Sequence, residues 1–565
     1  MAIPYYSHYR TLPAPEVSIF QFLLPDSPSD SPVKTFDPEL PAYIDGFTGY
    51  TLSRRQLKEN ALRLATGLRT LGFGRGDVAC LWGMNSIPWV EAAYGLLAAG
   101  IRITPANYAY EPTEVAHQLN NSGAQLILLE PSTLERFEKA RALLDKPIAD
   151  EHVLLLAQPG ALPAGTRYKS LYDHFGVSPG APETFNGEQA HETAWQCYSS
   201  GTTGLPKGVE TTQHNIVAQL QGLAEIYEPL ESGKDVILGI LPMSHIYGLA
   251  IVLLRPLTIG VPVVVLPKYE EHSVLSAVGK YHVTHAPVVP PIVLSLVNSP
   301  NVHKYDLSSL KTFLAGAAPM SAELSQAFEK RFPHIAVIQA YGMTETSPVQ
   351  TAMSAARSKP GSCGQLVAGF TARLVGEDGR DVDLGEPGEL WVQGPCVMKG
   401  YWKNPEATRK TFSDDGKWFK TGDIMVVDAD GFYTVVDRSK ELIKYKGFQV
   451  APAELEALLL QHPKVHDAGV IGVWEESQAT ELPRAYVVAS PDAGVSHEHV
   501  HEHHGFIEEI KAWVAARVAN HKKLRGGIAV VELIPKSPSG KILRKDLRAR
   551  AKTELEGGIS KQAKL

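Results

Sequence analysis

Clusters of basic residues and long apolar runs are lacking in this chain. Its 565 residues carry 54 lysines and arginines against 61 aspartates and glutamates, which gives a formal net charge of -7. No basic block stands out, and this argues against a nucleic-acid partner, which would need such a block to neutralise phosphates. No apolar run reaches the roughly 18 residues that a transmembrane helix requires. We therefore expect neither a nucleic-acid partner nor a membrane span.

Cysteines are also few, and the four present are far apart in the sequence: Cys80, Cys197, Cys363 and Cys396. Their spacing matches no metal site and no disulfide framework, so we expect reduced, buried thiols in an intracellular protein.

The two ends of the sequence bear on localisation. The first ten residues lack a basic segment followed by an apolar core, so no secretory signal is expected. The last three residues, Ala563, Lys564 and Leu565, are a close variant of the peroxisomal Ser-Lys-Leu address. We expect a peroxisomal import receptor as a partner and the peroxisome as the compartment, with the cytoplasm as the alternative.

The most informative stretch that is present runs from Tyr198 to Val209, Tyr-Ser-Ser-Gly-Thr-Thr-Gly-Leu-Pro-Lys-Gly-Val. Glycines let the backbone approach a ligand closely, and successive backbone N–H groups form an anion-binding concavity. Hydroxyls and one ammonium add donors, so we expect a polyphosphate ligand. The loop is not a Walker A motif, because Gly208 follows the lysine where Ser or Thr is required. The candidate phosphate-binding residues are Ser199, Ser200, Gly201, Thr202, Thr203 and Lys207.

Strands and helices alternate over most of the chain. Apolar residues at spacings of three and four predict an amphipathic helix over 53–71, with a capping box of Ser53 and Gln56. The stretch 77–83 predicts a strand, and continuous apolar runs at 124–130 and 261–267 are typical of strands buried on both faces. Three prolines in 282–293 argue against a long regular helix there. This alternation predicts a layered α/β architecture.

Several strands are each followed by a polar or glycine-rich turn. The stretch 235–248 leads into His245, 312–320 into a Gly-Ala turn, and 336–346 into Thr344 and Glu345. Because open α/β sheets bind ligands beyond the carboxyl ends of their strands, these turns predict one shared cleft.

A new pattern begins near the Arg438/Ser439 junction. It follows a hairpin with a turn at 428–431 and precedes a helix over 452–460. We predict two domains, residues 1–438 and 439–565, the second large enough for a core of its own. The histidine-rich run 497–504 could bind metal, but its spacing defines no tetrahedral set, and a solvated turn is the favoured interpretation.

The 198–209 string closely resembles the phosphate-binding signature of the adenylate-forming enzymes, the superfamily of acyl-CoA synthetases, luciferases and adenylation domains. Further resemblances extend from about residue 51 to residue 545 and are closest to the 4-coumarate–CoA ligase branch. The resemblance implies a large layered N-terminal domain of α/β subdomains plus a small, mobile α+β C-terminal domain. It implies ATP, Mg²⁺ and coenzyme A, with a small carboxylic acid converted first to acyl-AMP and then to acyl-CoA.

The resemblance also assigns roles in the first half-reaction. Lys541, in Pro-Lys-Ser-Pro-Ser-Gly-Lys, matches the catalytic lysine of adenylation, and Glu345 would hold Mg²⁺. Asp423 and Arg438 would bind the ribose, and His245 would be a polar gate near the carboxylate. The other matching positions are Gln339, Ala340, Tyr341 and Thr344 at the nucleotide and Lys444 and Gln449 as further catalytic residues.

For the second half-reaction the resemblance points to another face of the C-terminal domain. Lys446 and Gly447 would meet the thiol acceptor, and Lys268 the phosphates of CoA. Because Lys541 and Lys446 lie at opposite ends of one small domain, we expect the domain to rotate about Lys440 between the two steps.

The resemblance places the wall of the acid pocket at Tyr247, Gly316, Ala317 and Ala340. Small residues leave room for a ring or chain, and the plant ligases usually have Gly where this chain has Ala340. The added methyl group shortens the slot, which argues against 4-coumarate itself and favours an aryl, arylalkyl or medium-chain acid. Such pockets discriminate by only about 1–3 kcal/mol per methylene, so we expect a broad range of acids.

Three other functions remain open at this point. One is a stand-alone adenylation enzyme that loads a carrier protein, and another is a luciferase-like monooxygenase. The third is a regulatory protein that binds nucleotide without catalysis, which the joint presence of Lys207, Glu345, Asp423 and Lys541 argues against.

Overall fold

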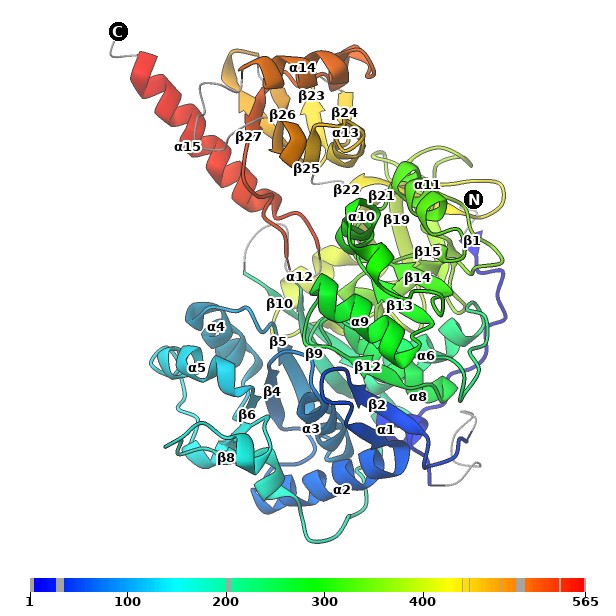
Figure 1. Cartoon of the computed structure of the whole chain (residues 1–565), viewed down its shortest axis with the longest axis vertical. Helices are drawn as coiled ribbons and strands as arrows, with labels where there is room; N and C mark the ends of the chain where they lie inside the picture. The colour runs from blue at the N-terminus through cyan, green and yellow to red at the C-terminus, as the bar shows by residue number, and fades with distance from the viewer. Residues whose placement is uncertain are drawn as a thin grey trace.

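The structure is a computed structural model that describes residues 5–26, 35–199, 205–438, 441–446, 448–478, 480–493, 504–537 and 540–562. The chain forms a large N-terminal body and a smaller C-terminal domain at the top of Figure 1. Their apolar cores are separate: the main core ends at Tyr433, and that of the small domain runs from Ile443 to Ala551. The predicted boundary at Arg438/Ser439 stays a prediction, and Ser439 and Lys440 lie outside the described residues.

A nine-stranded sheet carries most of the turns predicted to form the cleft. Its six central strands, from β15 to β2, are parallel. Its order is β17 (Gln365–Leu366), β16 (Val349–Ala352), β15 (Ala336–Gly342), β14 (Thr312–Ala315), β13 (His285–Val288), β11 (Ile237–Gly239), β12 (Val263–Val265), β2 (Pro41–Asp45) and β3 (Thr51–Ser53).

An eight-stranded sheet carries the glycine-rich stretch at one end. Its order is β20 (Gly400–Tyr401), β10 (Lys207–Thr212), β9 (Thr193–Ser199), β5 (Arg102–Ala106), β4 (Val78–Trp82), β6 (Leu126–Leu129), β7 (Val153–Leu155) and β8 (Lys169–Ser170). Alternate residues of β4 face two different cores: Ala79 and Leu81 join the main core, whereas Cys80 and Trp82 join a second one on the other face. This sheet is therefore covered on both faces, as the continuous apolar run at 124–130 predicted.

A third sheet of the large body is antiparallel and contains the predicted hairpin. Its order is β1 (Tyr5–Tyr6), β18 (Thr371–Val375), β19 (Gly388–Gln393), β21 (Phe419–Val427) and β22 (Tyr433–Arg438).

Twelve helices are described in the large body: α1 (Ile19–Leu23), α2 (Arg54–Thr70), α3 (Ile87–Ala98), α4 (Pro112–Ser122), α5 (Leu134–Arg141), α6 (Gln213–Ala224), α7 (Ile246–Gly248), α8 (Arg255–Ile259), α9 (Glu271–Tyr281), α10 (Pro290–Asn298), α11 (Ala322–Arg331) and α12 (Pro405–Thr411). Helix α2 begins as predicted, because Ser53 and Gln56 make both hydrogen bonds of the capping box.

The proline-rich stretch 282–293 contains no long regular helix, as predicted. Pro287 lies in β13, and Pro290 and Pro291 are the first residues of the nine-residue helix α10, which continues beyond the stretch. Prolines are tolerated in the first turn of a helix, where a missing N–H breaks no intrahelical bond. The last two prolines therefore also mark the start of a helix, which the sequence analysis did not predict.

Among the described residues of the small domain there are two sheets and three α-helices. Strands β23 (Ile443–Tyr445) and β24 (Phe448–Val450) form a hairpin, and β25 (Val465–Glu475), β26 (Thr480–Ala489) and β27 (Ile528–Val530) form a sheet. The helices are α13 (Pro452–Leu459), α14 (His504–Ala515) and α15 (Arg544–Gln562), and α13 begins at Pro452 as predicted. Figure 1 shows the segment before α15 extending into the large body.

Three further observations bear on the sequence predictions. All four cysteines are buried free thiols. In the described part of the chain, no helix combines the length and the apolar character that crossing a bilayer demands. The histidine-rich run lies outside the described residues except for His504, which begins α14.

Candidate active site

The glycine-rich stretch connects β9 and β10 as a hairpin, with Ser199 opposite Lys207. Ser200, Gly201, Thr202 and Thr203 lie outside the described residues. Neighbouring side chains fix the base of the hairpin: the Tyr198 hydroxyl donates to Asn121 Oδ1 at 2.6 Å, and His117 Nε2 lies 3.2 Å from the Pro206 carbonyl. The two strand ends that flank residues 200–204 are therefore held in place.

Lys207 and Glu345 are connected by Tyr401, which the sequence analysis did not identify. The Lys207 ammonium lies over the Tyr401 ring, 4.4 Å from its centroid. The Tyr401 hydroxyl donates to Glu345 Oε1 at 2.9 Å. Glu345 is only 6% exposed, in a short turn that follows β15. The predicted phosphate-binding cation and the predicted metal ligand thus share one neighbour.

The environment of Glu345 fits a Mg²⁺ site in which the protein supplies one ligand and the substrate phosphates supply others. Among the described residues, no three His, Cys, Asp or Glu side chains gather closely enough to hold a metal by themselves. Mg²⁺ commonly takes one or two carboxylates and fills its other positions with water and substrate phosphates. A single buried carboxylate near the phosphate hairpin matches that donor set. When bound, Mg²⁺ would neutralise phosphate charge at this position.

The predicted ribose-binding residues Asp423 and Arg438 are strand partners in β21 and β22 of the antiparallel sheet, although the Arg438 side chain is not described. Asp423 is 6% exposed, and the Tyr341 hydroxyl of β15 donates to its carboxylate. This hydrogen bond joins the antiparallel sheet to the strand that carries the other residues predicted at the nucleotide.

The predicted acid-pocket residues Tyr247, Gly316 and Ala340 come together at the carboxyl ends of parallel strands. A Cβ added at Gly316 would lie 3.2 Å from Tyr247 Cζ and 3.4 Å from the Ala340 carbonyl oxygen. The Tyr247 hydroxyl donates to the Leu314 carbonyl at 2.7 Å, which fixes its ring against Gly316. Ala317 follows with a φ of 69°, a left-handed conformation that is rare for a residue with a side chain.

The other residues predicted at the nucleotide lie on the same strand end. Gln339 and Ala340 are in β15, and Thr344 begins the turn that carries Glu345. Gln339 is buried, and Thr344 is partly exposed.

His245 lies at the start of α7, and its Nδ1 accepts a hydrogen bond from the Tyr247 backbone N–H at 3.3 Å. Burial lowers the pKa of its imidazole from 6.5 to about 3, and the charge of Lys541 adds to this lowering. The ring is therefore neutral at physiological pH. Because Nδ1 accepts, the hydrogen bond assigns the proton to Nε2, which can donate to an anionic group.

Lys541 reaches this region from the small domain. Its segment forms a tight turn, closed by the hydrogen bond from the Ser537 N–H to the Lys541 carbonyl at 2.8 Å. A Cβ added at Gly540 would lie 3.3 Å from Pro291 Cγ and 3.5 Å from Val289 Cβ, so the turn packs against the large body between β13 and α10. This contact, with the effect of Lys541 on His245, brings the predicted catalytic lysine to the acid pocket.

The β23–β24 hairpin carries residues predicted for both half-reactions: Lys444 and Gln449 for adenylation, and Lys446 and Gly447 for the thiol acceptor. Lys444 and Lys446 are exposed on the β23–β24 hairpin, where their backbone N–H groups donate to Glu481 and Thr480. In the described part of the chain, the hydrogen bonds of these two lysines stay within the small domain. Lys444 is opposite Gln449 in register, but the Gln449 side chain and Gly447 are outside the described residues. Lys268 is exposed in the turn after β12.

Contacts on both sides of the predicted hinge couple it to the Lys541 segment. Asp437 Oδ2 of β22 accepts a hydrogen bond from the Ala453 N–H in the first turn of α13, at 3.0 Å. Arg544, three residues after Lys541, pairs with Glu441 at 2.6 Å and with Glu456 at 2.7 Å. Burial raises the pKa of Glu456 to about 7, and Arg544 opposes this effect.

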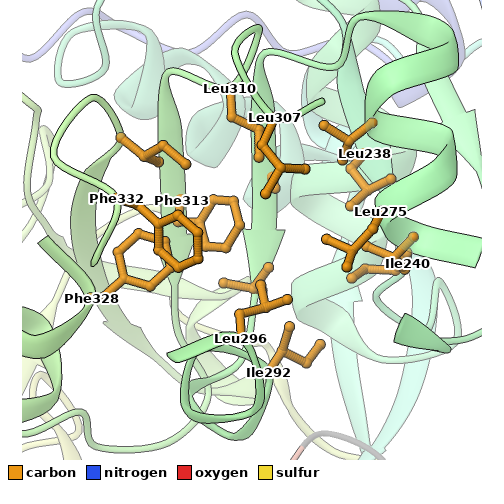
Figure 2. Close-up of a pocket in the computed structure, with 15 residues that line it drawn as sticks. Leu238, Ile240, Leu275, Ile292, Leu296, Leu307, Leu310, Phe313, Phe328 and Phe332 are labelled. Atoms are coloured by element: carbon orange, nitrogen blue, oxygen red, sulfur yellow. The ribbon is translucent and has the colours of Figure 1, made fainter. Parts of the chain in front are cut away.

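The cavity in Figure 2 is not part of this site. It lies among α9, α10, α11 and strands of the nine-stranded sheet, and its lining is entirely apolar, including Leu275, Phe313 and Phe328. Its volume of about 10 Å³ is at the lower limit for one water molecule, and it offers no polar partner. We interpret it as a packing defect of the core.

Comparison with known proteins gives matches along most of the chain. The model of the AMP-binding enzyme family matches residues 33–402, and that of the AMP-binding enzyme C-terminal domain matches residues 454–541.

Two relatives and one solved structure illustrate the extent of the similarity. 4-Coumarate-CoA ligase 1 of Narcissus pseudonarcissus is 36% identical over 568 residues, which cover 97% of this chain and 99% of that protein. Peroxisomal OPC-8:0-CoA ligase 1 of Arabidopsis thaliana is 36% identical over 519 residues, or 90% of each chain. The crystal structure of the anthranilate CoA ligase AuaEII with anthranoyl-AMP has a TM-score of 0.83 and 25% identity, covering 96% of this chain and 99% of that chain.

Proposed function

The chain belongs to the AMP-binding enzyme family and is an AMP-forming acid–CoA ligase that uses ATP, Mg²⁺ and coenzyme A, and we propose that the cleft around Lys541, His245 and Glu345 is its active site. The observation that supports this site most strongly is the position of the Lys541 turn. A loop of the small domain packs against the large body at Val289 and Pro291, beside the predicted acid pocket.

In the first half-reaction, a carboxylate oxygen of the acid attacks the α-phosphorus of ATP. A P–O bond forms there while the bond to the bridging oxygen of the β-phosphate breaks, and pyrophosphate leaves. The Lys541 ammonium reduces the repulsion between the two anions, and His245 Nε2 donates to the carboxylate. The β9–β10 hairpin and Lys207 hold the leaving phosphates, and Asp423 accepts hydrogen bonds from the ribose hydroxyls.

In the second half-reaction, the thiol sulfur of CoA attacks the carbonyl carbon of the acyl-AMP, and AMP leaves. The β23–β24 hairpin must then replace the Lys541 turn at the cleft, with Lys446 and Gly447 beside the pantetheine arm and Lys268 at the CoA phosphates. We propose that the small domain, residues 439–565, rotates about Lys440 to make this exchange. The location of Lys446 within the small domain, on a different element from Lys541, supports the rotation.

The acid is proposed to be an aryl, arylalkyl or medium-chain carboxylic acid. The flat ring of Tyr247, fixed through its hydroxyl, offers one face for an aromatic substrate. The absence of a side chain at Gly316 lets the Tyr247 ring pack directly against the backbone, because a Cβ there would lie 3.2 Å from Tyr247 Cζ. The methyl group of Ala340, in place of a glycine, reduces the length of the slot. Acids shorter than 4-coumarate should therefore be preferred.

The direct test of the function is a panel of acids assayed for nucleotide products. With Mg²⁺, ATP and a preferred acid but no CoA, the enzyme should release pyrophosphate and retain bound acyl-AMP. When CoA is added, it should turn the acid over to acyl-CoA and release AMP. Pyrophosphate release that CoA does not accelerate would indicate another acceptor, such as a carrier protein. ADP and phosphate as the products would contradict the proposal.

We also propose that the Ala563-Lys564-Leu565 tripeptide directs the protein to peroxisomes through an import receptor. These residues lie outside the described part of the chain, and the support is their similarity to the Ser-Lys-Leu address. One of the two relatives described above is named as peroxisomal. A fluorescent protein fused before the intact tripeptide should co-localise with a peroxisomal marker, and deletion of the three residues should leave it cytoplasmic. An unchanged distribution after deletion would contradict the proposal.

A further inference from the structure

Tyr401 connects two groups that the proposed function uses for the same ligand. Its ring supports the Lys207 ammonium at 4.4 Å, and its hydroxyl donates to Glu345 Oε1 at 2.9 Å. We propose that Tyr401 is a positioning residue that holds Glu345 for Mg²⁺ and Lys207 for phosphate, so that metal and nucleotide bind cooperatively. This inference rests on the proposed function, because it assumes that MgATP is the ligand of this cleft.

The backbone fixes the position of the Tyr401 ring. Tyr401 is the strand partner of Val209 in β10, two residues after Lys207, so the register places the ring beside the lysine. The Trp402 N–H donates to the Gly208 carbonyl at 2.8 Å, which extends the pairing toward Lys207 and the phosphate hairpin. The ring position is therefore set by the same strand that carries Lys207.

A second backbone contact fixes Glu345 relative to the same segment. The Met398 N–H donates to the Glu345 carbonyl at 2.8 Å, three residues before Tyr401. The turn bearing Glu345 and the segment bearing Tyr401 are thus joined by one main-chain and one side-chain hydrogen bond. A substitution of the hydroxyl alone should remove the second bond and leave the first.

The hydrogen-bond geometry makes the Tyr401 hydroxyl the donor. Its oxygen lies 2.9 Å from Glu345 Oε1, and an ionised carboxylate can only accept. A donor on Oε1 orients the carboxylate and leaves lone pairs on Oε2 for a cation.

The inference is tested by calorimetric binding of ATP in the absence of acid, with Mg²⁺ and with EDTA. The ratio of the two affinities for ATP, with Mg²⁺ and with EDTA, defines the Mg²⁺-dependent gain in ATP affinity. Tyr401→Phe should reduce this gain roughly tenfold, because one hydrogen bond to a charged group is lost, and should leave binding in EDTA unchanged. Tyr401→Leu should also weaken binding in EDTA, because Lys207 loses the aromatic face beneath it.

A matched control is available elsewhere in the chain. The Tyr172 hydroxyl donates to the buried Glu91 carboxylate, remote in sequence from Lys207 and Glu345. Tyr172→Phe deletes the same kind of bond, so it should lower the melting temperature without changing the Mg²⁺-dependent gain. A loss of the gain in this variant would mean that destabilisation alone produces the effect, and it would overturn the inference.

The outcomes separate this inference from the proposed function. If the wild-type protein shows no Mg²⁺-dependent gain, the assignment of the cleft to MgATP fails. If the wild type shows the gain and Tyr401→Phe retains it in full, only the role of Tyr401 fails. If Tyr401→Phe does not fold, 3-fluorotyrosine at position 401 replaces it: a change confined to the Mg²⁺-dependent gain supports the role, and an unchanged gain contradicts it.

Discussion

Lys541→Ala should abolish formation of acyl-AMP while leaving the transfer of a supplied acyl-AMP to CoA largely intact. The ammonium separates two anions as they approach, and at ~4 Å with an effective dielectric near 20 it is worth about 4 kcal/mol. That energy corresponds to a loss of roughly a thousandfold in the rate of adenylation. Pyrophosphate release in a single turnover measures the first step, and thioester formation from synthetic acyl-AMP measures the second.

Lys545 provides the control for this substitution. It follows Lys541 by four positions, carries the same charge, and is exposed at the start of α15. Lys545→Ala should leave both half-reactions unchanged. Lys446→Ala should produce the opposite pattern from Lys541→Ala, with adenylation retained and thioester formation lost. Equal damage by Lys541→Ala and Lys446→Ala to the same half-reaction would contradict the rotation of the small domain.

A disulfide between positions 289 and 540 should stop the enzyme after the first half-reaction. A Cβ at Gly540 would lie 3.5 Å from Val289 Cβ, at the short end of the roughly 3.5–4.5 Å range found in disulfides. The oxidised Val289→Cys/Gly540→Cys protein should form one equivalent of acyl-AMP but no acyl-CoA, and a reductant should restore thioester formation. The four native thiols are buried, so mild oxidation should favour the introduced pair.

The two single variants show how much activity each cysteine substitution removes by itself, without a crosslink. Gly540 has a φ of 79°, so any side chain there is strained by roughly 1–2 kcal/mol in either redox state. Gly540→Cys alone should therefore show some loss of activity that a reductant does not reverse. Full acyl-CoA production by the oxidised double variant, with the crosslink verified by mass spectrometry, would show that the small domain need not leave this position.

The parts of the site that follow strand ends could be predicted from the sequence. Tyr247, Gly316 and Ala340 lie in or just after separate apolar runs, and the parallel order of those runs brings the three residues together. The helix at 54–70 could be predicted for a similar reason, because its start depends on two residues only three positions apart. The rule for strand ends was sufficient to predict that these turns meet, and the local pattern to predict where the helix begins, whereas the individual pocket residues came from the family resemblance.

Tyr401 could not be predicted, because its role depends on pairing between distant segments. It lies in a two-residue strand with no periodicity of its own, and only its register with Val209 places it beside Lys207. The bond from Ala453 to Asp437 is a contact between domains and has no local signal either. The start of α10 was missed because Pro290 and Pro291 favour the first turn of a helix as well as breaking an interior one.

The central claim is that a carboxylate oxygen becomes bonded to the α-phosphorus of ATP beside Lys541. It is tested most directly with a preferred acid carrying ¹⁸O in both carboxyl oxygens, turned over with Mg²⁺, ATP and CoA. The account predicts that the AMP released contains one ¹⁸O atom and that the acyl-CoA retains the other. AMP without the label, or ADP in place of AMP, would contradict it.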